Sequence, residues 1–318
     1  MRELFTFGRY LRNKFHKKIY KIPVAMPGFT CPNIDGSVAV GGCSFCENES
    51  FSPNLAQKPK NKLSLSISSK DNPFLDFQLT ALGAQIEKNR KILAKKFKSE
   101  AFLVYFQAFS NTYAPFETLK TLYQKALEFD DVIGISIGTR SDCLEDRLLD
   151  FLGELSDTKE IWVEIGVQSA FDETLNKINR GHDYKSIEDA AKRIKSRGLN
   201  LCTHLIFGLP GESEDMMYET FKKSLELGAD SIKFHPLYVV KNTALANELK
   251  SGKFTPISEE AYLRVLTKCI SELPGNVSVQ RVSAGIDDES LLAPGWCRVK
   301  HTQMQKIKEA LLALGIRY

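Results

Sequence analysis

Residues 27–46 read PGFTCPNIDGSVAVGGCSFC and carry three of the seven cysteines in the chain. Eleven residues separate Cys31 from Cys43, and two residues separate Cys43 from Cys46. Two thiolates in a C-x2-C spacing can hold one metal centre from a single loop. Pro32 and the Gly41–Gly42 pair can bend the backbone so that the distant thiolate of Cys31 converges on the other two. The stretch therefore predicts a metal site.

The number of ligands distinguishes the kinds of metal site. A structural zinc ion is closed by four protein ligands, and the usual iron–sulfur cluster takes four cysteines. This loop offers three, since no fourth Cys or His lies near it and His16 stands fifteen residues before Cys31. A three-cysteine cluster leaves one iron open to a ligand that is not protein, as in a catalytic site. The pattern favours an iron–sulfur cluster, and a zinc site or a chance grouping remains the alternative.

The rest of the composition indicates an ordinary globular protein. The 318 residues are 43% hydrophobic and 26% charged, enough for one large α/β domain with an appendage or for two modest domains. The other four cysteines are scattered singly, and we expect them to be buried thiols: Cys143, Cys202, Cys269 and Cys297. No apolar run approaches the ~20 residues that span a bilayer. The amino terminus has no apolar signal-peptide core, so we expect a cytoplasmic protein without a membrane segment.

Short apolar runs alternate with amphipathic stretches along most of the chain. Strands are predicted at residues 21–25, 102–107, 132–137, 161–167, 199–207 and 231–236, and helices at 74–97, 116–129, 145–156, 186–197 and 214–227. This alternation predicts a parallel sheet built from βαβ units. Six units form an open barrel or a doubly wound sheet, and periodicity alone does not choose between them.

Two regions break the alternation. Residues 47–73 are polar and rich in Ser, Pro, Asn and Lys, and we interpret them as a loop over the site. After residue 236 we predict a helix at 258–273, a strand at 276–282 and a last helix at 303–314. We therefore expect a core domain at 1–240, with a basic amino-terminal segment, and a small α+β appendage at 241–318.

Each predicted strand ends in polar residues. In strand order they are Cys31; Ser110, Asn111 and Thr112; Arg140 and Asp142; Gln168 and Ser169; Gly208–Glu212; and His235. In parallel barrels and open sheets the active site lies at the carboxyl ends of the strands. We therefore expect these residues to meet at one edge of the sheet.

Several motifs together resemble the radical S-adenosylmethionine superfamily, and within it the YhcC/YtqA-like subgroup, which is related to the radical domain of elongator's catalytic subunit. They are TCPNIDGSVAVGGCSFC at 30–46, YFQAFSNTYAP at 105–115, GTRSDCL at 138–144, EIGVQSAFDETLNKINRGHD at 164–183, HLIFGLPGE at 204–212 and LLAPGW at 291–296. Phe45 precedes the last cysteine, as is common in that superfamily. The superfamily's best-known spacing is C-x3-C-x2-C, and the longer first gap here is similar to the subgroup.

The resemblance implies a fold and a chemistry. It implies a partial (β/α)6 TIM-type barrel with one [4Fe–4S] cluster on Cys31, Cys43 and Cys46. It further implies an enzyme that cleaves S-adenosyl-L-methionine reductively and removes hydrogen from a substrate with the resulting radical. Such an enzyme takes its electron from a low-potential donor of the flavodoxin or ferredoxin type.

The resemblance also suggests residues that hold the cofactor. Ser110, Asn111 and Thr112 stand where the superfamily often has a Gly-Gly-Glu run that grips the cofactor's amino group. The alternative is a capped turn before the next helix. Gln168 resembles a residue at the ribose. Arg180 resembles one at the carboxylate, which its guanidinium could hold through two bonds, unless it forms a surface ion pair.

Three more residues are expected beside the cofactor. Gly208 lets the backbone approach an adenine closely. Glu164 faces the barrel interior, and a buried acid needs a function or a partner, for which we name Arg140. His204 could face the pocket and exchange a proton with His235, or both could be structural.

The substrate is the least determined part. Arg140, His235, Arg281, Trp296 and Lys300 are our candidates for substrate contacts. Residues 1–100 carry 17 Lys and Arg against 8 Asp and Glu, a net +9, whereas the remainder carries −5. This asymmetry and the elongator-like motifs suggest modification of a tRNA wobble uridine. A small-molecule or peptide substrate, a non-catalytic Fe–S protein that senses redox state or binds partners, and a zinc-binding module remain alternatives.

The expected tRNA contact is a basic segment just before the first strand. It consists of Arg9, Arg12, Lys14, Lys17 and Lys18. We expect it beside the barrel rim, where its cations could neutralise phosphates.

Overall fold

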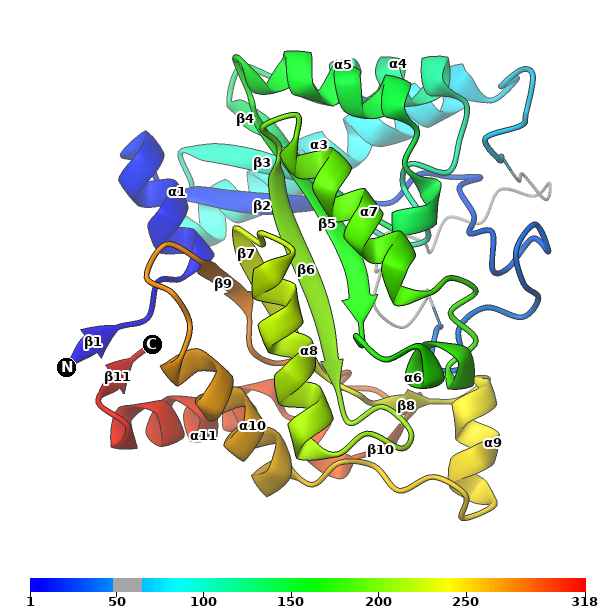
Figure 1. Ribbon diagram of the computed structural model, residues 1–318. Coiled ribbons are helices and arrows are strands. Elements are labelled where there is room, and N and C mark those ends of the chain that lie inside the picture. The colour runs from blue at the N-terminus through cyan, green and yellow to red at the C-terminus, as the bar shows by residue number, and fades with distance from the viewer. Residues whose placement is uncertain (48–64) are drawn as a thin grey trace.

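The computed structural model describes residues 1–47 and 65–318. One parallel sheet, in the order β2-β3-β4-β5-β6-β7-β9, curls into a partial barrel (Figure 1). Its strands are β2 (Ile19–Val24), β3 (Ala101–Phe106), β4 (Val132–Thr139), β5 (Glu160–Gln168), β6 (Asn200–Phe207), β7 (Ser231–Pro236) and β9 (Ser278–Arg281). The predicted partial α/β barrel is confirmed, and all six predicted core strands are present.

The strand order explains why the sheet forms a barrel. Strands β2 to β7 are neighbours in space in the same order as in the sequence. Right-handed crossovers in an unbroken order all return over the same face, so the helices cover the outside of the sheet. They are α3 (Leu75–Phe97), α4 (Phe116–Leu127), α5 (Asp146–Ser156), α6 (Asp172–Lys177), α7 (Tyr184–Lys195) and α8 (Glu214–Glu226). Asp183 and Ser213 fix the starts of α7 and α8 by accepting hydrogen bonds from backbone amides.

The carboxy-terminal part contributes to the barrel as well as to the appendage. The strand expected at 276–282 forms as β9, but it pairs with β7 and completes the sheet. The other elements there are β8 (Val239–Val240), α9 (Ala244–Lys250), α10 (Glu259–Ser271), β10 (Leu291–Ala293) and α11 (Lys300–Ala313). A last strand, β11 (Ile316–Arg317), pairs with β1 (Arg2–Glu3), so the chain ends lie close together (Figure 1). The domain division at residue 240 stays a prediction.

Helix α1 (Phe7–Phe15) covers the amino ends of the strands. Its buried residues belong to a second core cluster that consists of Phe7, Leu11, Ile19, Ala101, Leu103, Trp162 and Cys202. The ring of Phe7 meets that of Trp162 edge to face at 5.0 Å between centroids. Glu160, at the start of β5, accepts hydrogen bonds of 2.7 Å from Tyr10, Lys14 and Trp162. The helix therefore closes the bottom of the barrel.

This position corrects the expectation for the basic segment. Because α1 directly precedes β2, it lies at the amino end of that strand, whereas the cysteine loop follows the carboxyl end (Figure 1). Two of its cations also have partners in the fold. Arg9 pairs with Glu3, and Lys14 pairs with Glu160. The five cations do not lie beside the rim that carries the cysteines.

The described residues contain no helix that is long and apolar enough to cross a membrane. Of the loop expected at 47–73, residues 48–64 lie outside the described part of the chain. Leu65, just after them, is buried in the larger hydrophobic cluster, which includes Val24 and Phe106 of the sheet.

The closure of the barrel bottom by α1 is testable. Replacing Phe7 with Ala should lower the free energy of unfolding by about 3–5 kcal/mol, because it empties a site that Trp162 and Leu11 enclose. Phe77→Ala on α3 is the matched control, since Phe77 is 45% exposed, and it should change stability by no more than about 0.5 kcal/mol. Urea unfolding of both variants checks this. Equal losses would show that α1 is not part of the core.

Candidate active site

A pocket of about 260 Å³ opens at the carboxyl ends of the strands. It brings together twelve of the seventeen site residues that the sequence suggested: Cys31, Cys43, Phe45, Cys46, Ser110, Arg140, Glu164, Gln168, Arg180, His204, His235 and Arg281. They come from the cysteine loop, from six of the seven barrel strands or the turns that follow them, and, for Arg180, from the turn after α6. The other five, Asn111, Thr112, Gly208, Trp296 and Lys300, are not among its lining residues.

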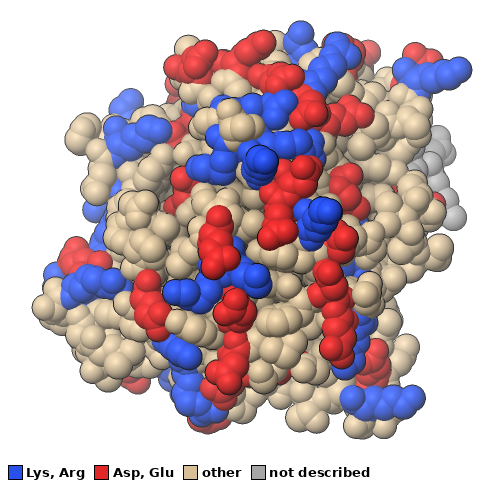
Figure 2. Space-filling view, in the orientation of Figure 1, with Lys and Arg blue, Asp and Glu red and all other residues tan. Residues whose placement is uncertain are grey.

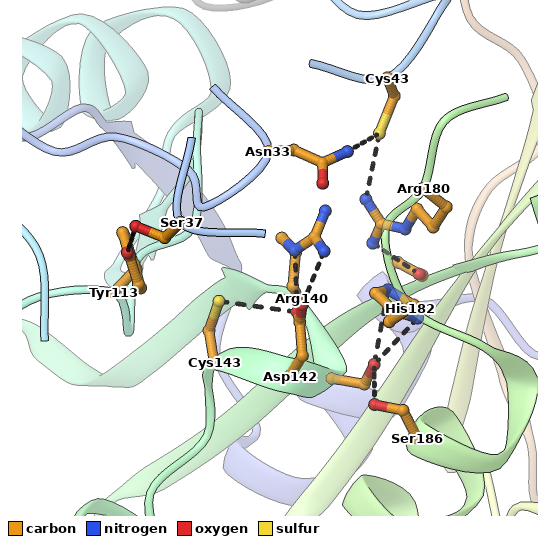
Figure 3. A network of polar contacts seen from close by, with 12 residues as sticks. Asn33, Ser37, Cys43, Tyr113, Arg140, Asp142, Cys143, Arg180, His182 and Ser186 are labelled. Atoms are coloured by element: carbon orange, nitrogen blue, oxygen red, sulfur yellow. Dashed lines mark hydrogen bonds and ion pairs between the residues drawn. The ribbon is translucent and has the colours of Figure 1, made fainter. Parts of the chain in front are cut away.

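The three cysteines of the loop converge on this pocket, and none of them forms a disulfide. Burial raises the pKa of Cys46, and the neighbouring thiolates of Cys43 and Cys31 raise it further. Three sulfurs that repel one another's charge are unfavourable unless a cation lies among them. The donor set therefore fits a thiolate-bound metal centre. The next nearest thiol, Cys143, is buried, and its Sγ lies 3.7 Å from Oδ1 of Asp142 (Figure 3).

The turn after α6 clamps the cysteine loop. Nδ2 of Asn179 donates to the carbonyls of Gly42 at 2.8 Å and Val40 at 3.1 Å. Nδ2 of Asn33 donates back to the carbonyl of Asn179 and lies 3.5 Å from Sγ of Cys43. Gly181 has a positive φ of 76°, and a Cβ there would lie 2.3 Å from Oδ1 of Asn33. The glycine of the NRGH motif is therefore required for this close approach.

Arg180 reaches from the same turn to the cysteine loop (Figure 3). Its Nη1 donates to Sγ of Cys43 at 3.6 Å, and its Nη2 donates to the carbonyl of Gly166 at 2.9 Å. The Nε atom is buried without a hydrogen-bond partner among the described residues. Arg180 is not a surface residue, since it is 6% exposed. Its cation is placed to stabilise negative charge beside the cysteines.

Gln168 ends β5 in a conformation that non-glycine residues rarely adopt, with φ of 66°. Its Oε1 atom is buried and has no hydrogen-bond partner within the described residues. A Cβ at Gly166 would lie 2.5 Å from Nε2 of Gln168. Backbone strain of this kind costs on the order of 1–3 kcal/mol and is commonly retained at functional sites. The side chain presents an unused acceptor to the pocket.

The run Ser110 to Thr112 divides between pocket and scaffold. Ser110 lines the pocket, and its Oγ atom has no partner in the described structure. Asn111 donates to the carbonyls of Ala108 and Gly138 at 2.9 Å each. The hydroxyl of Thr112 hydrogen-bonds Thr139 at 2.6 Å. The latter two side chains therefore fix the turn against β4.

Gly208 lies in a second pocket of about 390 Å³ with the rest of the GLPGE turn. Its φ is 93°, and a Cβ there would lie 2.7 Å from Ile257, so the turn packs closely against the carboxy-terminal part. Glu212 in the same turn hydrogen-bonds Ser169, and burial raises its pKa to about 7.

Arg140 does not pair with Glu164, contrary to the expectation from the sequence. It forks onto Asp142, two residues along, with bonds of 2.8 and 2.7 Å (Figure 3). The local turn brings this carboxylate close, so the charge of Arg140 is already neutralised.

Glu164 instead accepts from side chains of four other strands. Lys21 of β2 and Lys233 of β7 both donate to it, as does Ser136 of β4. Nε2 of His204 lies 2.7 Å from its Oε2. Burial alone would raise the pKa of Glu164, but the two lysines hold it well below its usual range. Glu164 is therefore an ionised group at the centre of the barrel.

The two histidines beside this cluster are neutral at pH 7. Burial, with the charge of Lys233 as the next contributor, lowers the pKa of His204 to about 4. Burial also holds the pKa of His235 well below its usual range, with Arg281 the next contributor. An ionised Glu164 accepts the Nε2 proton of His204, which leaves Nδ1 as the basic atom of that ring.

Sequence reasoning missed Lys21 and Lys233. The signal was present, since each is a lone lysine within a short apolar strand, IYKIPV and SIKFHP. The alternation of side chains across a strand could have placed both inside.

A metal ion among Glu164, Cys202 and His204 would be geometrically possible, since their ligand atoms lie within 4.8 Å of one another. Both Glu164 oxygens already accept bonds from ammonium groups, however. The cluster is therefore not suited to a cation.

Two substrate candidates lie away from the pocket lining. Trp296 packs against Tyr262 and donates its indole N–H to the carbonyl of Ile257 at 3.2 Å. Lys300, at the start of α11, is exposed. Neighbouring protein atoms still partly desolvate its ammonium group, which together with the charge of Arg281 lowers its pKa.

Known proteins resemble the whole chain. The family model of the Radical SAM superfamily matches residues 39–223, and that of the Radical_SAM C-terminal domain matches residues 229–313. Protein YhcC of Escherichia coli (strain K12) is 33% identical over 312 residues, 98% of this chain and 93% of that protein. A tRNA uridine(34) acetyltransferase of Methanocaldococcus infernus is 31% identical over 157 residues, 48% of this chain and 29% of that protein.

One solved structure, the archaeal Methanocaldococcus infernus Elp3 with an N-terminus deletion (1–46), has the same fold. It superposes with a TM-score of 0.61 at 20% identity. The match covers 93% of this chain and 64% of that one.

The buried charge cluster makes a stability prediction. Glu164→Gln should lower the free energy of unfolding by about 3–5 kcal/mol at pH 7, because it leaves Lys21 and Lys233 buried without an anion. A carboxylate with a lowered pKa stabilises the fold above its unfolded pKa of about 4.3, so the loss should shrink as the pH falls below that value. Glu214→Gln, which breaks an exposed pair with Arg264, should cost at most about 1 kcal/mol. Denaturant titrations at pH 7 and pH 4 test this, and an undiminished loss at low pH would contradict it.

Proposed function

The chain belongs to the radical SAM superfamily, and we propose that it is a radical enzyme holding one [4Fe–4S] cluster on Cys31, Cys43 and Cys46. When bound, the reduced cluster cleaves S-adenosylmethionine, and the 5′-deoxyadenosyl radical so formed removes a hydrogen atom from the substrate. The observation that carries the proposal is the set of three cysteines, none of them in a disulfide, that converge on one pocket. Three cysteines would leave one iron of the cluster without a protein ligand, and a catalytic centre needs an open coordination position of this kind.

The surrounding residues have roles that suit this chemistry. Asn33 and Arg180 direct N–H groups at the Cys43 sulfur, which stabilises a thiolate there. Gln168 and Ser110 present unused polar atoms to the same pocket, as a polar cofactor requires. His204, kept neutral and oriented by Glu164, offers a base within the barrel. A low-potential flavodoxin or ferredoxin is the electron donor we propose.

The cluster assignment predicts that the cluster requires Cys43 and does not require Cys143. Anaerobically reconstituted wild type should hold about four irons and four sulfides per chain and release 5′-deoxyadenosine from S-adenosylmethionine after reduction with dithionite. Cys43→Ala should lose both. Cys143→Ala is the matched control, because Cys143 is buried near the loop but does not line the pocket. Iron loss in that control, or stoichiometric zinc in the wild type, would refute the assignment.

We further propose that the substrate is a uridine in tRNA. The support is the 31% identity of half the chain to a tRNA uridine(34) acetyltransferase. The charge distribution argues against the surface over α5, α7 and α8 as the RNA contact. Figure 2 shows that Lys and Arg there are interspersed with Asp and Glu. Many are paired, for example Arg197 with Asp150 and Lys195 with Asp230.

Nucleoside analysis tests the substrate directly. Deleting the gene should remove one modified uridine from cellular tRNA, and its unmodified or partly modified precursor should accumulate. Complementation with wild type or Cys143→Ala should restore it, whereas Cys43→Ala should not. An unchanged nucleoside profile after deletion would exclude tRNA and favour a small molecule or peptide.

A further inference from the structure

The interior of the pocket carries more positive than negative charge. Among the described lining residues the only acid is Glu164, which already accepts from Lys21 and Lys233. Arg140 is neutralised by Asp142, and Arg180 faces the Cys43 sulfur. Lys233 and Arg281 in the lining therefore exceed Glu164 by one charge, and Lys21, which donates to Glu164 without lining the pocket, adds a second positive charge to the same cluster. Lys233 is buried, whereas Arg281, which also lines the pocket, is exposed. Because a buried positive charge is unfavourable without a counter-ion, the pocket favours an anion beside these two side chains.

The excess charge is concentrated at one corner of the barrel. Lys233 of β7 and Arg281 of β9 are direct cross-strand partners, and both line the pocket. Like charges opposite each other destabilise a sheet unless something bridges them. Lys233 has Glu164 and Tyr105 as partners. Arg281 forms no hydrogen bond or ion pair within residues 1–47 and 65–318.

His235 adds a third group to this corner. It lies two residues after Lys233 on β7, and thus on the same face of the strand. Its Nε2 atom is buried and lacks a hydrogen-bond partner in the described structure. Buried polar atoms nearly always have partners, so the orphan indicates that a ligand belongs there. As a neutral ring, His235 can donate one N–H without adding charge.

We propose that the corner formed by Lys233, His235 and Arg281 binds an anionic group of the substrate, a carboxylate or a phosphate. This rests on the proposed function and narrows the substrate class. The planar guanidinium of Arg281 can donate two parallel bonds to either group, and the imidazole of His235 supplies a third. Lys233 contributes a positive charge, and its hydrogen bond to Glu164 fixes the position of its ammonium group. An anion held here fixes the substrate inside the same pocket as the cysteines.

Binding of simple anions tests the proposal. Reconstituted wild type with saturating S-adenosylmethionine should bind radiolabelled acetate, inorganic phosphate or both saturably in equilibrium dialysis at constant ionic strength. About one anion per chain is expected, and the tighter probe identifies the group as carboxylate or phosphate. Acetamide should not compete, because it lacks the charge. Arg281→Gln should weaken binding about tenfold or more, and Arg281→Lys should weaken it less, since it keeps the charge but loses the fork.

Arg264→Gln is the control, since this exposed arginine on α10 pairs with Glu214 away from the pocket, and it should bind the probes like wild type. Absence of saturable binding to wild type, equal binding by Arg281→Gln, or displacement of the probe by S-adenosylmethionine would overturn the proposal. The last result would assign the corner to the cofactor instead. Iron content and 5′-deoxyadenosine release by the same wild-type preparation show separately whether the proposed function holds.

Discussion

The ionised carboxylate of Glu164 is the constraint on which the barrel interior depends. It belongs to β5 and accepts hydrogen bonds from Lys21 of β2, Ser136 of β4, Lys233 of β7 and His204 of β6. One buried acid thus connects five of the seven strands across the concave face. Such a cluster gives little net stability compared with an apolar core, but removing one member is costly. Beside this cluster, Nε2 of His235 is buried and has no hydrogen-bond partner among the residues that the structure describes.

The two ends of the barrel divide stability from chemistry. At the amino ends, α1 and the ring of Trp162 form a closed apolar cluster. At the carboxyl ends, the cysteine loop is held by polar contacts, chiefly those of Asn33, Asn179 and Arg180. These contacts orient the loop chiefly through backbone carbonyls, and the three cysteine side chains line the pocket. The same division is typical of parallel barrels, where the carboxyl-end loops carry function.

Much of this could be predicted from the sequence, because its signals are local. The strand–helix alternation predicted the barrel strands. The cysteine spacing and the polar residues at the strand ends predicted where the site lies. Three features depend on long-range geometry instead. Strand β9 pairs with β7, although 41 residues separate Pro236 from Ser278. Helix α1 lies at the barrel bottom because connectivity, not charge, places it. Glu164 takes lysines rather than Arg140, because Asp142 is a nearer partner for that arginine.

The central claim is that the three-cysteine centre leaves one iron open and that S-adenosylmethionine binds to it. Electron–nuclear double resonance on the reduced cluster, with S-adenosylmethionine labelled with nitrogen-15 in its amino group and oxygen-17 in its carboxylate, tests this most directly. The account predicts strong magnetic coupling of both labels to the cluster, since both groups would lie directly at the open iron. A spectrum identical to that of a sample with unlabelled S-adenosylmethionine, recorded on an intact cluster, would contradict it.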